Sequence, residues 1–166
     1  MVKLPKKEAL GVDFGGVIIE WTKEEKDVTL SRSNVPDAFE SLRQLVDGRF
    51  GDNVFVVSKT ERETQDKIIA WLLHQNFYKI TGVKLENIYF CQKREEKAGI
   101  CKKLGITHFI DDRLENLGYL SNVGVKNLYL FQGRQNEIQK NIHFIPMVKL
   151  VNSWQEILSK LLPSVD

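Results

Sequence analysis

Residues 8–17 read Glu-Ala-Leu-Gly-Val-Asp-Phe-Gly-Gly-Val, and this stretch is the most informative in the chain. A short apolar segment ends on the carboxylate Asp13, and the chain then turns at Gly15 and Gly16. Glycine adopts backbone conformations that other residues avoid, and it lets a ligand approach the main chain closely. A strand that ends beside glycines presents its last side chain at the edge of an α/β sheet where ligands bind. We therefore interpret Ala9–Asp13 as the first strand and Asp13 as a candidate reactive group.

Strand and helix patterns alternate along the rest of the chain. Further strands are predicted over Asn53–Ser58, Asn87–Cys91, Thr107–Ile110, Asn127–Phe131 and Val148–Val151. Helices are predicted over 36–46, after residue 60, over 95–104, after residue 112 and after residue 153. Such alternation is typical of a parallel sheet with helices on both faces. The predicted fold is therefore α/β, a three-layer Rossmann-like domain with a mostly parallel sheet of five to six strands.

Two helix starts carry a capping-box pattern, in which a hydroxyl residue precedes a glutamate by three positions. One is formed by Thr60 and Glu63, and the other by Ser153 and Glu156. Residues 132–146 are polar and show no clear period, so an irregular segment is expected there.

Length and composition predict an ordinary globular domain. The chain has 166 residues, which fits a single domain over 1–166. A net charge of +2 gives no strong nucleic-acid signal. Its apolar runs are too short to span a membrane, the start lacks the apolar core of a secretory signal, and the two cysteines show no disulfide framework. A cytoplasmic protein is expected.

Other polar residues follow the predicted strands in the same way as Asp13. The second strand ends on Ser58, the fourth delivers Asp111 and Asp112, and Lys97 precedes that fourth strand. One parallel sheet brings the carboxyl ends of its strands to a common edge. Neighbouring carboxylates repel each other, and a hard cation such as Mg²⁺ relieves the repulsion while also binding a phosphate oxygen. The residues thus predict a magnesium site that takes a phosphorylated substrate or ligand.

The order of these groups resembles the haloacid dehalogenase-like (HAD) superfamily. Asp13-Phe14-Gly15-Gly16-Val17 matches the first motif, Ser58 the second, Lys97 the third, and Phe109-Ile110-Asp111-Asp112 the fourth. Lys93 is an alternative for the third motif. The likeness covers the chain from about Ala9 to Val151.

The resemblance implies a Mg²⁺-dependent phosphohydrolase. Asp13 would attack phosphorus to form an aspartyl-phosphate, with Ser58 and Lys97 as the other catalytic residues. The metal ligands would be Asp13, the backbone carbonyl of Gly15, and one or both of Asp111 and Asp112.

The sequence departs from the family at Gly15, where the first motif usually has a second Asp. That Asp protonates the leaving oxygen and later activates water, and such general acid–base catalysis is worth roughly 10²–10⁴-fold. The implied activity is therefore low or specialised, and Gly15→Asp is expected to raise it. The alternative is a catalytically impaired protein that binds a phospho-ligand or a partner in a regulatory role.

The resemblance also implies a member without a separate cap domain. Residues 17–33, which include the charged run Lys23–Asp27, are interpreted as a flap or hairpin. The interval between Ser58 and Lys97 holds one helix and one strand and little more. Capless members often accept large substrates or close their sites by oligomerising, so a homo-oligomer is a possible assembly. The stretch before Val17 also resembles the phosphate loop of sugar kinases, but those folds need about twice this length.

Overall fold

The computed structural model describes residues 7–22 and 27–163. Residues 23–26 of the predicted charged run and residues 1–6 at the start of the chain lie outside the described residues.

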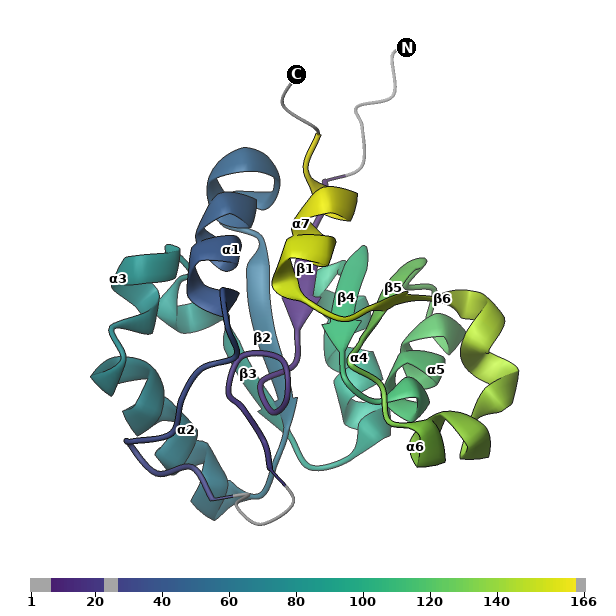
Figure 1. Ribbon diagram of the computed structural model, residues 1–166, viewed down its shortest axis with the longest axis horizontal. Helices are drawn as coiled ribbons and strands as arrows, with labels where there is room; N and C mark the ends of the chain where they lie inside the picture. Colours follow the sequence, from purple (N-terminus) through teal and green to yellow (C-terminus); the bar gives the residue numbers. More distant parts are fainter. Residues whose placement is uncertain (1–6, 23–26, 164–166) are drawn as a thin grey trace.

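The described residues form a six-stranded sheet in the order β3-β2-β1-β4-β5-β6, and every neighbouring pair is parallel (Figure 1). The strands are β1 (Leu10–Val12), β2 (Val54–Lys59), β3 (Ile88–Cys91), β4 (His108–Asp111), β5 (Asn127–Phe131) and β6 (Val148–Val151). The predicted Rossmann-like α/β fold and the strand number are confirmed.

Helices cover both faces of this sheet. They are α1 (Ala38–Leu45), α2 (Arg62–His74), α3 (Phe77–Thr81), α4 (Arg94–Leu104), α5 (Leu114–Asn122), α6 (Gln135–Lys140) and α7 (Trp154–Leu161). Shorter turns are a π-helical turn at Val46–Phe50 and 3-10 segments at Leu85–Asn87 and Ile142–Met147. Buried side chains of α1, α2, α3 and α7 pack in one core cluster, and those of α4 and α5 pack in a second on the other face.

The two predicted capping boxes have different outcomes. The hydroxyl of Ser153 accepts a hydrogen bond from the Glu156 backbone N–H at 3.1 Å, so this cap is confirmed. The cap predicted at Thr60 is wrong, because α2 begins after Glu61 and has no side-chain cap. The backbone N–H of Thr60 donates instead to the carbonyl of Cys91, which ties this residue to the end of β3. The segment 132–146 is also more regular than predicted, since it contains α6 and all but the last residue of the 3-10 helix Ile142–Met147.

The position of β1 in the sheet determines where the functional edge forms. β1 lies between β2 and β4, with Val12 paired to Val56 on one side and to Ile110 on the other. The residues that follow these three positions therefore emerge side by side. They include Asp13 after β1, Ser58 near the end of β2 and Asp111 at the end of β4.

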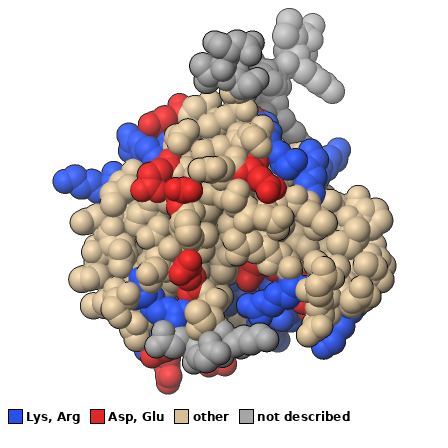
Figure 2. Space-filling model, in the orientation of Figure 1, with Lys and Arg blue, Asp and Glu red and all other residues tan. Residues whose placement is uncertain are grey.

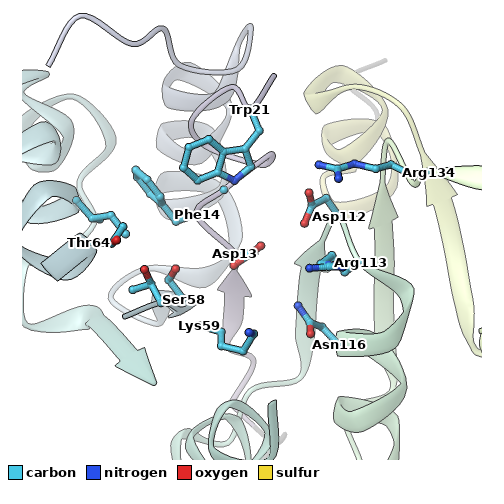
Figure 3. Close-up of a pocket in the computed structure, with 13 residues that line it drawn as sticks. Asp13, Phe14, Trp21, Ser58, Lys59, Thr64, Asp112, Arg113, Asn116 and Arg134 are labelled. Carbon is cyan, nitrogen blue, oxygen red and sulfur yellow. The ribbon is translucent and has the colours of Figure 1, made fainter. Parts of the chain in front are cut away.

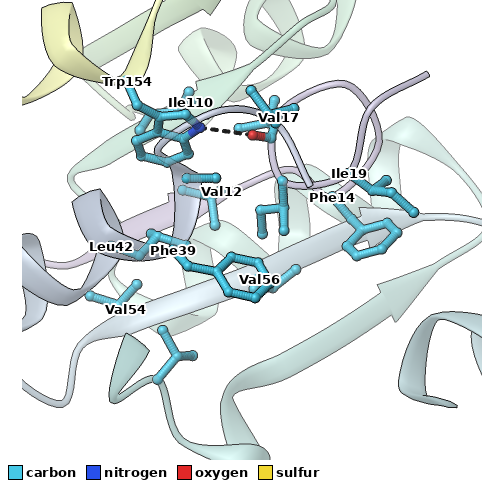
Figure 4. Close-up of a cluster of buried hydrophobic side chains, with 14 of the residues drawn as sticks. Val12, Phe14, Val17, Ile19, Phe39, Leu42, Val54, Val56, Ile110 and Trp154 are labelled. Atoms are coloured by element: carbon cyan, nitrogen blue, oxygen red, sulfur yellow. Dashed lines mark hydrogen bonds between the residues drawn. The ribbon is translucent and has the colours of Figure 1, made fainter. Parts of the chain in front are cut away.

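The loop after β1 is anchored in the core by two tryptophans. Its apolar residues Val17, Ile18 and Ile19 are fully buried. The indole N–H of Trp154 donates to the Val17 carbonyl at 2.9 Å (Figure 4), and that of Trp71 donates to the Arg32 carbonyl at 3.0 Å. The loop is thus fixed at both its start and its end.

The surface shown in Figure 2 carries lysines and arginines interspersed with acidic side chains. No helix among the described residues is long and apolar enough to cross a membrane.

Candidate active site

Asp13 is held at the head of a tight turn. Its backbone N–H donates to the carbonyl of Ile110 at 2.9 Å, which extends the β1–β4 pairing by one residue. The carbonyl of Phe14 then accepts from Ile18 at 2.9 Å and closes the turn. Gly16 has φ +77°, and a Cβ there would lie 2.3 Å from an Asp112 carboxylate oxygen. Glycine at position 16 thus permits both the turn and the close approach of Asp112.

Lys97 joins two carboxylates at the base of the site. Its ammonium lies 3.1 Å from Asp13 Oδ1 and 2.9 Å from Asp111 Oδ2, and its side chain is only 1% exposed. Burial alone would lower the pKa of Lys97, but Asp111 and Asp13 reverse this and hold the pKa above its ordinary value. Lys93 is the exposed residue that precedes α4. The geometry therefore places Lys97, and not Lys93, against Asp13.

The two carboxylates of the fourth motif have different surroundings. Asp111 is fully buried and accepts hydrogen bonds from Lys97, the Arg113 backbone N–H at 3.0 Å and the Asn116 amide at 3.2 Å. Asp112 instead lines the open pocket above Asp13. Its side chain is therefore the more accessible of the two.

Three carboxylates converge here, and Lys97 binds two of them, Asp13 and Asp111. One oxygen from each of Asp13, Asp111 and Asp112 lies within 4.8 Å of the others. Burial and then the charge of Asp111 raise the pKa of Asp13, although Lys97 opposes the shift. Burial and then the charges of Asp13 and Asp111 raise the pKa of Asp112, although Arg134 opposes it. Oxygen ligands with surplus negative charge suit a hard divalent cation, so this donor set fits Mg²⁺.

A pocket of about 250 Å³ opens above Asp13 (Figure 3). Ser58 lies in its wall, as predicted from the end of β2. The structure thus brings together all the residues that sequence reasoning selected, and their chemical roles remain predictions. The lining residues that sequence reasoning did not assign to the site are Phe14, Trp21, Lys59, Thr60, Thr64, Ile68, Arg113, Asn116 and Arg134.

The sequence could have identified some of these lining residues from their position. Arg113 and Asn116 follow the acidic pair directly at the start of α5, where residues three apart share a face. Trp21 and Arg134 carry no such sequence signal, because the fold alone brings their loops to Asp13.

Three solved structures share this architecture with substantial overlap. The D,D-heptose 1,7-bisphosphate phosphatase of B. bronchiseptica, complexed with magnesium and phosphate, is 13% identical, with a TM-score of 0.64 over 93% of this chain and 97% of its own. A dehalogenase with an intermediate complex is 20% identical, with a TM-score of 0.61 over 81% of this chain and 59% of its own. A haloacid dehalogenase-like hydrolase of Burkholderia xenovorans LB400 is 15% identical, with a TM-score of 0.54 over 78% of this chain and 57% of its own.

These likenesses show that the chain shares its α/β fold with these three structures. The chain spans less than two thirds of the dehalogenase and of the dehalogenase-like hydrolase. No protein-family model matches the sequence, and no curated protein matches it either.

Proposed function

We propose that this protein is a Mg²⁺-dependent phosphohydrolase that forms an aspartyl-phosphate on Asp13, with low or specialised activity. The observation that carries the proposal is the contact of Lys97 with both Asp13 and Asp111 beneath an open pocket. The heptose bisphosphate phosphatase with bound magnesium and phosphate has the same fold and supports the proposal.

Asp13 is the nucleophile in this account. Lys97 binds Oδ1 of Asp13, which orients the carboxylate and leaves Oδ2 to attack phosphorus. The same ammonium offsets the charge that gathers as the phosphoryl group arrives. Ser58 lines the same pocket, and its hydroxyl donates to a phosphoryl oxygen.

The metal would be held by Asp13, the carbonyl of Gly15 and Asp112. Asp111 is the weaker candidate because Lys97, Arg113 and Asn116 already occupy its oxygens. Bound Mg²⁺ would neutralise the carboxylates and draw charge from the phosphoryl oxygens.

A screen of phosphate esters with Mg²⁺ tests the proposal. Turnover that disappears in Asp13→Asn supports it. The matched control is Asp47→Asn, which changes an exposed carboxylate on the π-helical turn after α1. Equal turnover in Asp13→Asn and the wild type would contradict the proposal. Phosphate binding without any turnover would instead support the regulatory binder.

A further inference from the structure

Trp21 covers the backbone of Gly15. A Cβ added to Gly15 would lie 1.8 Å from the indole Nε1 and 2.5 Å from Cε2. The backbone is not the obstacle, because Gly15 is not among the residues with positive φ. The indole therefore fills the space into which any side chain at position 15 would project.

Contacts on the loop hold this indole in place. The guanidinium of Arg32 lies 5.6 Å from the centre of the Trp21 ring. Arg32 also donates to the carbonyl of Glu20, and the buried indole of Trp71 donates to the carbonyl of Arg32. Trp21 is thus a positioned wall of the pocket.

The pocket has an aromatic wall and a cationic wall. Phe14 and Trp21 lie together on one side of Asp13, and Arg113 and Arg134 lie on the other (Figure 3). Arg134 points toward Asp112 and the indole. A second pocket of about 300 Å³ adjoins the first, and Trp21, Asp112 and Arg134 line both. A group attached to a phosphoryl at Asp13 would therefore extend from the pocket past the indole.

The chemistry at position 15 restricts which groups can leave. Gly15 offers no acid, so the departing oxygen receives no proton from this position. Alkyl alcohols are very weak acids, whereas a phenol such as the tyrosine side chain has a pKa of about 10. An aryl oxygen can thus depart as its anion far more readily than an alkyl oxygen.

We infer that the site takes aryl phosphomonoesters, of which phosphotyrosine is one, with the aromatic ring against Trp21 and the phosphoryl group at Asp13. This inference rests on the proposed function. Aromatic rings attract each other in offset or edge-to-face arrangements, which supplies the contact.

The reaction proceeds in two steps. Asp13 Oδ2 bonds to phosphorus while the phosphorus–aryl oxygen bond breaks, and the phenolate leaves and takes a proton from water. Water then attacks the same phosphorus, the bond to Asp13 breaks, and inorganic phosphate leaves with the carboxylate restored. Because residue 15 provides no base, the second step is the slower one.

The test separates aromatic contact from leaving-group acidity. Phenyl phosphate is compared with a fluorinated alkyl phosphate whose alcohol has about the acidity of phenol. Trp21→Leu should lower kcat/KM for phenyl phosphate about tenfold, the size of a lost aromatic contact with its buried area, and change the fluoroalkyl ester less than twofold. Trp21→Phe, the matched control, should keep most of the preference. Equal losses on both esters in Trp21→Leu would overturn the inference.

A binding measurement distinguishes failure of the inference from failure of the proposed function. Phenylphosphonate and methylphosphonate are titrated by calorimetry with Mg²⁺. Tighter binding of phenylphosphonate that Trp21→Leu abolishes supports the aryl site even without turnover. Equal binding of both, unchanged in Trp21→Leu, contradicts the aryl site alone. If neither phosphonate binds, the protein has no phosphate site, and both the aryl site and the proposed function are contradicted.

Discussion

Gly15 and Trp21 behave as one unit at the scale of single residues. The indole lies where a side chain at position 15 would lie. The effect of a substitution at either residue therefore depends on which residue is present at the other position. Because of this contact, and in contrast to the expectation from sequence, Gly15→Asp alone is not expected to raise turnover.

The prediction concerns the single and double variants at these positions. Gly15→Asp alone should give no gain in turnover and should destabilise the fold by about 1–3 kcal/mol, because it overpacks against the indole. Gly15→Asp with Trp21→Ala should raise alkyl phosphate turnover by up to about 10²-fold, the lower end for general acid–base catalysis. Turnover assays and urea unfolding measure the two effects.

Trp21→Ala alone is the control for this pair, since it opens the space without supplying an acid. If Gly15→Asp alone were as stable as the wild type and turned over alkyl phosphates as fast as the double variant, the two positions would not be coupled.

Single residues differ in how far the sequence reveals them. The choice of Lys97 over Lys93 was predictable because Ala98 and Cys101 continue a buried stripe directly after Lys97. The role of Trp21 was not, because its contact with Gly15 depends on how an irregular loop folds back on itself.

At the scale of elements, α7 depends on a cap that α2 lacks. Ser153→Ala removes the hydrogen bond to the Glu156 backbone N–H and should cost about 1 kcal/mol. Thr60→Ala is the matched control and should stay within about 0.5 kcal/mol, because Thr60 caps no helix. The midpoints of urea unfolding measure both. A larger loss in Thr60→Ala than in Ser153→Ala would contradict the structure.

Burial made the bounds of β5 predictable, because four of its five residues are buried. The bounds of β6 also agree with the sequence prediction to the residue, although only Val151 in that strand is buried. The segment 132–146 was not predictable, because neither α6 nor the following 3-10 helix buries a residue fully. Without a buried face, a helix leaves little hydrophobic period in the sequence.

At the scale of the whole molecule, the order of the sheet creates the site. Sequence alternation predicted a parallel sheet, and a central β1 brings Asp13 between the ends of β2 and β4. The opposite end of β4 carries His108, which is buried beside Arg49. Burial, followed by the charge of Arg49, lowers the pKa of His108 to about 4, although Glu8 opposes the shift.

This shift predicts a pH dependence of stability that is separate from the site. Between pH about 6.5 and about 4 the unfolded histidine binds a proton that the folded one does not. Stability should therefore be fully present above pH 6.5 and fall by up to about 3 kcal/mol as the pH approaches 4. His108→Gln removes the titration, so urea unfolding of the two proteins across this range isolates the effect. A stability difference between them that does not change with pH would refute it.

The proposed function requires that Asp13 accept a phosphoryl group. The most direct measurement is mass spectrometry of the intact protein and its peptides after brief reaction with phenyl phosphate and Mg²⁺. We expect one phosphoryl group, located on Asp13 and absent from Asp13→Asn, and we expect it to accumulate because Gly15 provides no base for its hydrolysis. A wild-type protein that releases phenol without phosphorylation of Asp13, or that is labelled equally in Asp13→Asn, would contradict the account.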